Sequence, residues 1–381
     1  MAVPVSERPD EQIVERLKIL MIDHSLPLWA HSGWDSVRGG FVERLNAAAN
    51  ADELAPRRVR VQARQIYCFA KAAQLGWYPQ GREVSIRGLE YLLAKAKSPD
   101  GEPGFVHLLN ADGSVLDPLR DSYDHAFVLL ALATVYQLVQ EAEVQEEIKS
   151  LVGFLDDHMK SPYGGVLEGI PSRLPRRQNP QMHLFEAMIA TFDSMPFPIY
   201  RDRADGLFQL FISKLYDQQR QTLGEYFEND WSKIEPAIVE PGHQAEWVWL
   251  LKAYERISSC STAQYRSQLL ASALRYRDNL TSCLIDEGDS DGKIRKFTRR
   301  LWPQTEIAKA WIAQAEAGEP GAVAEALQAL IRLYRHYLCH PVSGAWYDQF
   351  DQDNRSLVDF VPASSFYHII CAVAEAERVL G

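Results

Sequence analysis

Apolar and polar residues alternate along the chain in a pattern that predicts helices of two kinds. Segments 143–159 and 204–219 carry apolar residues at three- and four-residue spacing with charged and polar residues between them, which is typical of helices with one buried face. Other segments, such as 128–133, are apolar on every side and predict helices that are surrounded by protein. The pattern therefore predicts inner helices covered by outer ones.

The apolar segments recur with a period of about sixty residues. A short polar and aromatic stretch opens each of them, and one polar residue from each stretch gives positions 64, 125, 183, 246, 306 and 368. A glycine followed by aromatic or β-branched residues, as at Gly40-Phe41 and Gly104-Phe105, precedes each stretch and predicts a tight turn or short hairpin. The repeating unit is thus an outer helix, a short hairpin and an inner helix.

Six such units can form an open solenoid or a closed ring. Because the inner segments are apolar nearly throughout, as though surrounded, closure is favoured. We expect one all-α domain over residues 1–381, an (α/α)6 barrel with short β-hairpins in its loops. All six helix-opening stretches would then meet at one rim.

Composition narrows the functional classes. The chain has 381 residues, a net charge of −11 and a pI near 5.5, which argues against a nucleic-acid partner. Its five cysteines are scattered without a C-x-x-C motif, so a disulfide framework or zinc knuckle is not expected. Residues 1–12 are polar and acidic, and no apolar run approaches a membrane span. We expect a cytoplasmic protein without a membrane partner, as a monomer or small homo-oligomer.

The predicted rim gathers side chains suited to acid–base chemistry. Histidine titrates near neutral pH, and aromatic rings can stack on a sugar. His243 and Glu246 stand three residues apart at the start of an inner helix, as do His183 and Glu186, so each Glu could orient its imidazole. The full set of candidates is Arg64, Tyr123, Asp124, His125, Asn179, His183, Glu186, His243, Glu246, Trp302, Gln304, Glu306 and His368.

Other chemistries remain open at this point. His-x-x-Glu pairs can bind zinc or iron, although H-E-x-x-H is absent. Asp124 with Glu186 or Glu306 could serve as acid and base of a glycoside hydrolase on the same toroid. A basic cluster at Arg173, Arg176 and Arg177 could attract an anion or form a salt-bridged loop. Nucleotide-binding motifs are absent.

Several motifs together resemble the N-acylglucosamine 2-epimerase superfamily. They are N-P-x-M-H-L-x-E-A from Asn179, P-G-H-x-x-E-W-x-W-L-L from Pro241, W-P-Q-T-E from Trp302 and S-F-Y-H from Ser365. The sequences at Arg176–Pro180 and Leu301–Glu306 are most similar to those of the D-mannose isomerase branch. Leu301 departs from the tryptophan pair usual in the cellobiose 2-epimerase branch, which favours a monosaccharide pocket.

The resemblance implies an (α/α)6 barrel that interconverts D-mannose and D-fructose, and also D-lyxose and D-xylulose, without a metal or cofactor. It implies that His368 moves the carbon-bound proton, that His243 is the acid/base for ring opening and the oxygen protons, and that Glu246 holds His243. Arg64 would stabilise the enediolate. The substrate-binding set would be Tyr123, Asp124, Asn179, His183, Glu186, Trp302, Gln304 and Glu306. A 2-epimerase acting on N-acylglucosamine, mannose or a related sugar is the alternative, because it needs the same groups.

Overall fold

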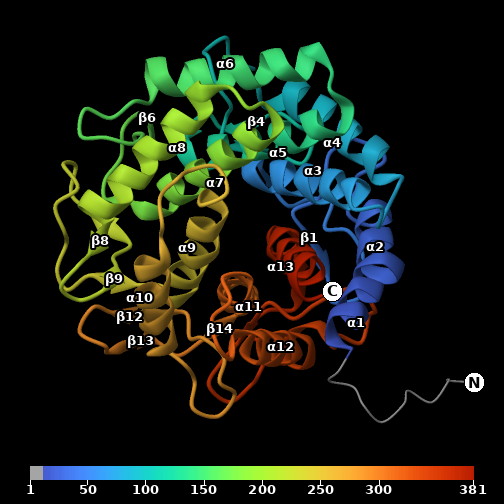
Figure 1. Cartoon of the computed structure of the whole chain (residues 1–381). Helices are drawn as coiled ribbons and strands as arrows, with labels where there is room; N and C mark the ends of the chain where they lie inside the picture. Colours follow the sequence, from blue (N-terminus) through green and yellow to red (C-terminus); the bar gives the residue numbers. More distant parts are fainter. Residues whose placement is uncertain (1–11) are drawn as a thin grey trace, which may run out of the picture.

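Two concentric layers of helices surround a central axis in the computed structural model, which describes residues 12–381 (Figure 1). Residues 1–11, most of the polar and acidic start that contributes to the expectation of a cytoplasmic protein, lie outside the described part. The inner layer consists of α3 (Val59–Gln74), α5 (Ser122–Val139), α7 (Gln178–Ser194), α9 (Pro241–Tyr254), α11 (Leu301–Glu316) and α13 (Ser364–Leu380). The outer layer consists of α1 (Ile13–Leu20), η1 (Met21–Ser25), α2 (Leu26–His31), α4 (Gly81–Ala96), α6 (Ala142–His158), α8 (Pro198–Leu210), η2 (Phe211–Leu215), α10 (Ala263–Leu274), α12 (Ala322–Leu333) and η3 (Tyr334–Leu338).

The inner layer closes on itself. Each inner helix packs on the next in chain order, and the last, α13, packs against the first, α3. The outer helix α1 contacts both α12 and α13, so the start of the described chain covers the junction with its end. The predicted closed (α/α)6 barrel is confirmed, and an open solenoid is excluded.

Short strands close a second ring at one end of the barrel. They are β1 (Arg44–Asn46), β2 (Arg57–Arg58), β3 (Leu108–Leu109), β4 (Val115–Asp117), β5 (Arg120–Asp121), β6 (Gly169–Ile170), β7 (Arg176–Arg177), β8 (Tyr216–Asp217), β9 (Thr222–Leu223), β10 (Tyr226–Phe227), β11 (Ile238–Val239), β12 (Glu287–Asp289), β13 (Ile294–Lys296), β14 (Arg299–Arg300), β15 (Gln349–Phe350) and β16 (Phe360–Pro362). All pairs are antiparallel: β2–β3–β4, β5–β6, β7–β10, β8–β9, β11–β12–β13, β14–β15 and β16–β1.

These pairings position the rim. The strands that lead into inner helices (β2, β5, β7, β11, β14 and β16) each pair with a strand from the following unit. The sixth of them, β16, returns to β1 of the first unit, with Leu45 opposite Val361. Backbone hydrogen bonds therefore fix the first turn of every inner helix relative to its neighbours.

Helix α5 shows why the inner layer is so apolar. By length and composition its 18 residues could cross a membrane, which corrects the expectation that no segment approaches such a span. Within the ring, however, 72% of that window is buried, as in the core helix of a globular protein. Asp121 caps the helix by accepting hydrogen bonds from the backbone N–H groups of Tyr123 and Asp124.

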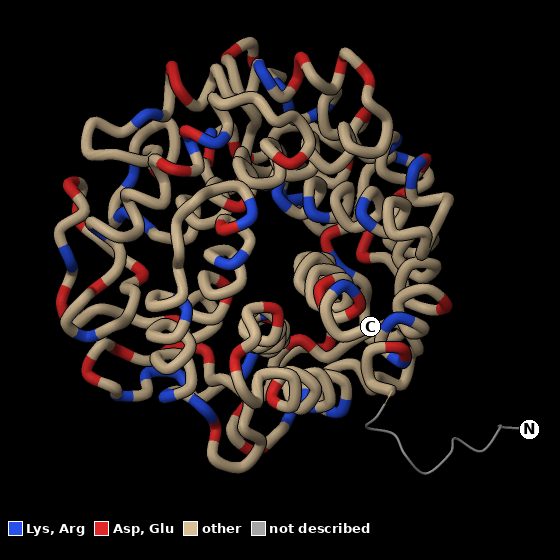
Figure 2. The backbone as a smooth tube through the Cα atoms, viewed as in Figure 1, with Lys and Arg blue, Asp and Glu red and all other residues tan. Residues whose placement is uncertain are grey.

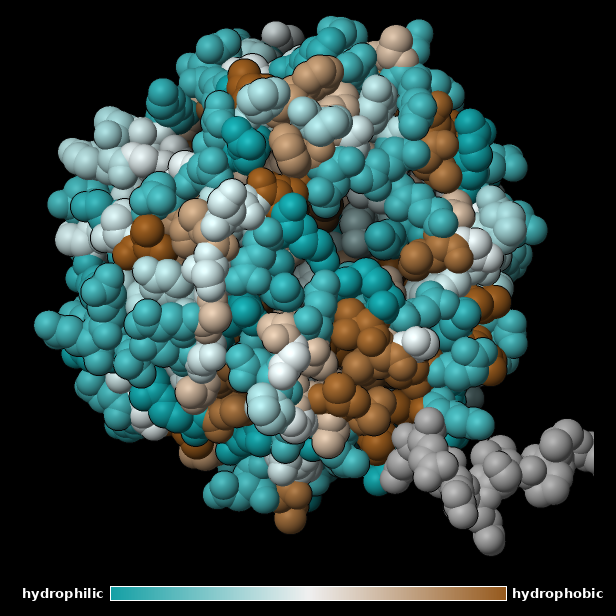
Figure 3. Space-filling model, in the orientation of Figure 1, coloured by the Kyte–Doolittle hydropathy of each residue, from teal (hydrophilic) through white to brown (hydrophobic). Residues whose placement is uncertain are grey.

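Charged residues lie mainly around the outside of the ring, with a smaller number on the inner helices (Figure 2). A cavity of about 140 Å³ lies between the C-terminal halves of the inner helices, away from the strand-bearing rim. Lys71, Asp193, Trp249 and Arg256 are among its lining residues, and Glu186 reaches it from the rim side. The space-filling view along the axis is hollowed near the middle of the ring (Figure 3).

Candidate active site

His243 lies in the first turn of α9, and a residue from outside that helix holds its ring. Its Nδ1 is 2.9 Å from Glu225 Oε2 and 3.9 Å from Glu240 Oε2. Burial alone would lower the pKa of His243, but the carboxylates of Glu225 and Glu240 outweigh it and raise the pKa to about 10. The imidazole is therefore positively charged at neutral pH. The prediction that Glu246 holds His243 is wrong, because Glu225 does so.

His368 lies in the second turn of α13 and is equally buried, but it has the opposite charge preference. Its Nδ1 is 2.7 Å from Glu306 Oε1. Burial lowers the pKa of His368 well below its usual range, and the positive charges of Arg64 and Lys309 lower it further. The side chain is thus a neutral imidazole at neutral pH.

Trp302 brings these two histidines to one place. Its ring centroid is 4.8 Å from that of His243 and 5.7 Å from that of His368, with interplanar angles of 38° and 39°. Trp302 itself is partly exposed, whereas both imidazoles are only 5% exposed. An indole flanked by one charged and one neutral imidazole offers a flat apolar surface between an acid and a base.

A third histidine, His183 of α7, lies deeper in the same region. Its Nδ1 donates to Glu186 Oε2 at 2.9 Å, and the phenol of Tyr367 donates to the other oxygen of that carboxylate. Burial outweighs the hydrogen bond to Glu186 and lowers the pKa of His183 to about 4, so this ring is also neutral. Glu186 and Glu306 therefore hold the rings of His183 and His368, and neither carboxylate is placed to contact a substrate directly.

Arg64 of α3 presents its guanidinium to the same space. It donates to Tyr123 Oη at 2.7 Å and to the Ser364 carbonyl at 3.2 Å, and it stacks 4.1 Å from the ring centroid of Phe127. Its Nε is buried without a hydrogen-bond partner among the described residues. A positive charge that contacts a phenol, a carbonyl and a ring can still form an ion pair with an oxyanion.

Glu246 is fully buried at the centre of the group. One of its oxygens is 3.9 Å from His183 Nε2. A carboxylate oxygen of Glu246 also lies within 4.8 Å of a carboxylate oxygen of Glu306 and of a ring nitrogen of His368. Neither oxygen has a hydrogen-bond partner among the described residues. Burial and the neighbouring Glu306 raise the pKa of Glu246 well above its usual range, so the group is a neutral acid that can donate.

Two of the predicted substrate-binding side chains lie where a ligand can reach them. Asn179 and Tyr123 are partly exposed near the starts of α7 and α5, although the Asn179 side-chain oxygen is itself buried, without a hydrogen-bond partner among the described residues. With Trp302 they form the outer edge of the group.

Gln304 and His125 have structural roles that the sequence prediction missed. Gln304 accepts from the Leu284 N–H and donates to the Leu284 carbonyl, so it clamps the hairpin of its own unit. His125 accepts from the Phe105 N–H through Nε2, which leaves Nδ1 to donate to the Asp121 carbonyl. The same clamp is made in other units by Gln62, Gln181 and Gln244. The expectation that Gln304 contacts sugar hydroxyls is wrong.

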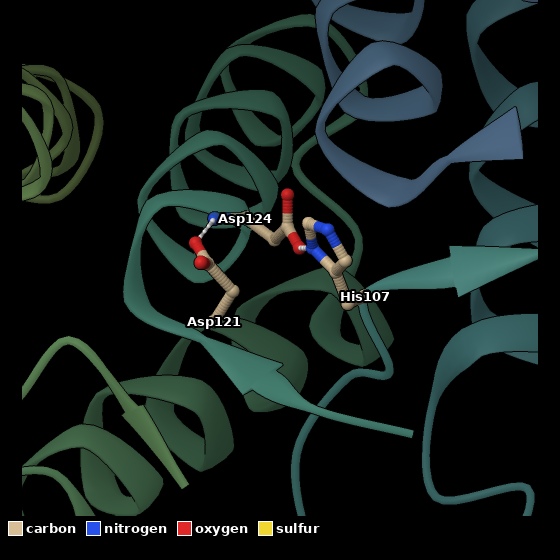
Figure 4. A group of neighbouring side chains, drawn as sticks. All are labelled: His107, Asp121 and Asp124. Carbon is tan, nitrogen blue, oxygen red and sulfur yellow. Dashed lines mark hydrogen bonds and ion pairs between the residues drawn. The ribbon is translucent and has the colours of Figure 1, made fainter. Parts of the chain in front are cut away.

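Asp124 is also removed from the predicted site. Figure 4 shows its carboxylate pointing toward the ring of His107 and away from Asp121, whose own carboxylate caps the helix. Asp124 is fully buried, 2.6 Å from His107 Nδ1 and 3.1 Å from an Arg60 nitrogen. The hydrogen bond to Asp124 raises the pKa of His107. This closed ion-pair network leaves Asp124 unavailable as the acid of a glycoside hydrolase.

Three groups in the site hold carboxylate and imidazole atoms close enough to share a cation: His183 with Glu186 and Glu246, Glu225 with Glu240 and His243, and Glu246 with Glu306 and His368. In each group a carboxylate accepts from an imidazole Nδ1. Lys309 already supplies a positive charge to the third group, with Nζ 2.7 Å from Glu306 Oε2. These imidazole and carboxyl groups are suited to passing protons to one another.

Two arginines of the basic cluster are held by neighbouring groups. Arg177 pairs with Glu168 at 2.7 Å and with Asp121 at 3.4 Å, and Arg176 is buried against Ser161 and the ring of Trp231. The alternative of a salt-bridged loop therefore holds for Arg177, while Arg176 is buried and Arg173 is exposed.

The N-acylglucosamine 2-epimerase (GlcNAc 2-epimerase) family model matches residues 39–372, most of the chain. The chain belongs to this family. It is therefore an enzyme of the isomerase and epimerase class, as the motifs predict. The matched range includes the residues that form the group around Trp302.

Relatives and solved structures agree with this assignment. A mannose-6-phosphate isomerase from Rhizobium meliloti (strain 1021) is 36% identical over 94% of this chain and 95% of its own length. A D-mannose isomerase from Marinomonas mediterranea is 27% identical over 83% of this chain and 84% of its own. The structure of cellobiose 2-epimerase from Spirochaeta thermophila superposes with a TM-score of 0.87 over 99% of both chains at 22% identity, which shows a shared fold.

Glu225, which sequence reasoning did not single out as a site residue, had a detectable signal. It follows the hairpin residue Leu223 by two positions, and acidic residues recur at that place in most units: Glu43, Glu168, Glu225, Asp286 and Asp348. Glu43 and Glu168 pair with arginines, whereas Glu225 faces a histidine at the rim. A periodic carboxylate that pairs with arginine in two units and faces a histidine in this one is the signal that could have singled out Glu225 as a candidate site residue.

Proposed function

We propose that this enzyme interconverts D-mannose and D-fructose, and D-lyxose and D-xylulose, through a cis-enediolate without a metal. The observation that supports this most directly is the pair of imidazoles on either side of Trp302, one charged and one neutral. Two titratable groups whose surroundings push their pKa values apart are the usual signature of a general acid and a general base.

Each proton of the reaction has a carrier. When the sugar opens, His243 as the imidazolium protonates the ring oxygen and takes back the proton that oxygen 1 loses as the aldehyde forms. His368 Nε2 then takes the proton from carbon 2 of the open-chain aldose. The electron pair of that C–H bond forms the C1–C2 double bond, and negative charge develops on oxygen 1. Arg64 and the neutral Glu246 stabilise this charge. His368 then returns the proton to carbon 1, while His243 moves a proton from oxygen 2 to oxygen 1.

The charges around the site support a free sugar as substrate. Glu186, Glu225, Glu240, Glu246 and Glu306 surround it. Three arginines of the rim strands are held by carboxylates: Arg58 by Glu43, Arg177 by Glu168, and Arg300 at 3.8 Å from Asp286. A sugar phosphate would add about two negative charges to this carboxylate-rich surface. We therefore expect D-mannose to be a better substrate than mannose 6-phosphate.

Product analysis with the purified protein tests the proposal. We expect fructose from mannose, incorporation of deuterium from heavy water at carbon 1 of that fructose, and a kcat/KM for mannose at least about tenfold above that for mannose 6-phosphate. His243→Ala and His368→Ala should fold normally and lose turnover. Glucose as the product would favour the 2-epimerase alternative instead, and near-normal activity in either variant would remove the role assigned to that histidine.

A further inference from the structure

Lys309 is a fully buried cation beneath the candidate site. It lies on α11, one turn after Glu306, and its Nζ is 2.7 Å from Glu306 Oε2. On its other side the ammonium sits 4.0 Å from the ring centroid of Trp249. Removing an ammonium from water is costly unless close partners compensate, so the position requires both the carboxylate and the indole face.

The ion pair breaks the symmetry between two buried carboxyls. Glu306 and Glu246 offer oxygens within 4.8 Å of each other and of a His368 ring nitrogen. Two carboxylates this close and this well buried cannot both be ionised cheaply. Lys309 Nζ forms an ion pair with Glu306 Oε2, although neither atom has a hydrogen-bond partner among the described residues. Both oxygens of Glu246 also lack a hydrogen-bond partner there, and they do not have this close ion pair with Lys309. Because Lys309 lies against Glu306 and not against Glu246, its charge favours the ionised form of Glu306 and leaves the proton on Glu246.

The charge of Glu306 controls where the His368 proton resides. An ionised carboxylate can only accept, so the 2.7 Å contact between Glu306 Oε1 and His368 Nδ1 requires a proton on Nδ1. The lone pair then lies on Nε2, the nitrogen on the other side of the ring. If Glu306 were protonated it could donate to Nδ1, and a neutral imidazole would then carry its proton on Nε2.

We propose that Lys309 is a positioning residue that fixes the tautomer of His368: by ion-pairing with Glu306 Oε2 it keeps Oε1 an acceptor, holds the imidazole proton on Nδ1 and leaves Nε2 free to take a proton. The catalytic consequence rests on the role proposed for His368. The tautomer does not, and it can be measured directly.

Long-range ¹H–¹⁵N correlation of ¹⁵N-histidine-labelled protein separates the two tautomers, with His368→Asn to assign the signals. We expect the Nδ1–H form in the wild type and a shift to mainly the Nε2–H form in Lys309→Met. Lys71→Met, which removes a lysine from the cavity behind the site, is the matched control and should leave the His368 signals unchanged. A Nδ1–H tautomer that persists in Lys309→Met would overturn the proposal.

Kinetics give a second readout. Lys309→Met should lower kcat for mannose isomerisation by at least about 50-fold while KM changes less than about threefold, because a base in the wrong tautomer still binds the sugar. A loss carried mainly by KM would instead indicate distorted packing. Lys309→Gln provides a second neutral variant if the methionine variant does not fold. Should the wild type lack isomerase activity, the tautomer measurement still decides the role of Lys309, and a wild-type Nε2–H tautomer would refute it.

Discussion

Replacing Glu225 by glutamine tests whether a residue outside α9 sets the charge of His243. The change keeps the shape of the side chain and an oxygen that can accept from His243 Nδ1, and it removes one negative charge 2.9 Å away. Gln178 donates to the same carboxylate oxygen at 3.0 Å and remains available to hold the new amide. The variant therefore changes the charge of the pocket with little change in its packing.

The size of the effect can be worked from the structure. A rise in the pKa of His243 from its ordinary 6.5 to about 10 corresponds to about 5 kcal/mol in favour of the imidazolium. Glu225 and Glu240 share this effect, and Glu225 is the closer of the two. Burial and the charge of Glu225 raise the pKa of Glu240 to about 7, so loss of Glu225 lets Glu240 ionise more fully and compensate in part. We expect the pKa of His243 to fall by about one to two units.

The pH dependence of kcat/KM measures this directly. A raised pKa means that the imidazolium is present at low and neutral pH and is lost as the pH rises through about 10. In Glu225→Gln the basic limb of the profile should move down by about one to two pH units, with kcat/KM at pH 7.5 reduced about ten- to hundredfold because a charge-assisted hydrogen bond is lost. Fructose formation must be corrected for alkaline conversion of mannose without enzyme, and samples exposed to high pH must regain activity at pH 7.5.

Glu228→Gln is the matched control, because this exposed glutamate lies three residues further along the same hairpin. Its profile should overlay that of the wild type. A basic limb in Glu225→Gln that coincides with the wild-type limb would refute the assignment of His243 as a charged acid held by Glu225.

Three further outcomes follow from contacts in the structure. Gln304→Ala leaves the buried N–H and carbonyl of Leu284 unpartnered and should lower the free energy of unfolding by about 2–4 kcal/mol in urea titrations, with kcat changed less than about threefold; a larger loss of kcat would return Gln304 to the site. His125→Gln should keep stability within about 1 kcal/mol of wild type by thermal unfolding, because glutamine makes this clamp in other units, whereas His125→Ala should lose about 1–3 kcal/mol. Arg64→Lys should reduce kcat/KM about ten- to hundredfold through loss of the planar donor fork, and an unchanged value would show that the guanidinium does not contact the enediolate.

The fold was largely predictable because inner and outer helices differ in pattern. The segment predicted as an outer helix over 143–159 is α6, Ala142–His158, and the apolar segment 128–133 lies within α5. The glycine series was less uniform than expected. Gly40, Gly104 and Gly344 have positive φ where the hairpin turns, but Gly292 turns a different hairpin between β12 and β13. Strand pairing between units could not be predicted, because two-residue strands carry almost no periodic signal.

Errors in the site arose where a few residues change the direction of a side chain. The periodic series of rim positions includes His125, but its structural equivalents in other units are Gln62, Gln181, Gln244 and Gln304. Phe127, two residues further on, lies between Arg64 and His183. Two residues along a helix rotate the side chain by about 200°, to nearly the opposite side of the helix. A sequence period that is known only to within a few residues therefore cannot tell a side chain that holds the hairpin from one that faces the site.

Partner assignment failed for a related reason. Helical spacing correctly pairs His183 with Glu186, but it also suggested His243 with Glu246. The Nδ1 of His243 faces the short strands at the rim and contacts Glu225, which lies 18 residues earlier in the chain. Glu246 lies one turn deeper, near His183. Such contacts depend on the pairing of short strands from neighbouring units and lie beyond the reach of local spacing.

The contact of α13 with α3, sealed by β16 on β1, makes assembly of the ring and assembly of the chemistry a single event. His368 enters the site only with this last helix, which also supplies Tyr367 to Glu186 and the Ser364 carbonyl to Arg64. A growing polypeptide on the ribosome would therefore hold five units of an open ring without His368 in the site, and the complete group of side chains would form only when the ring closes.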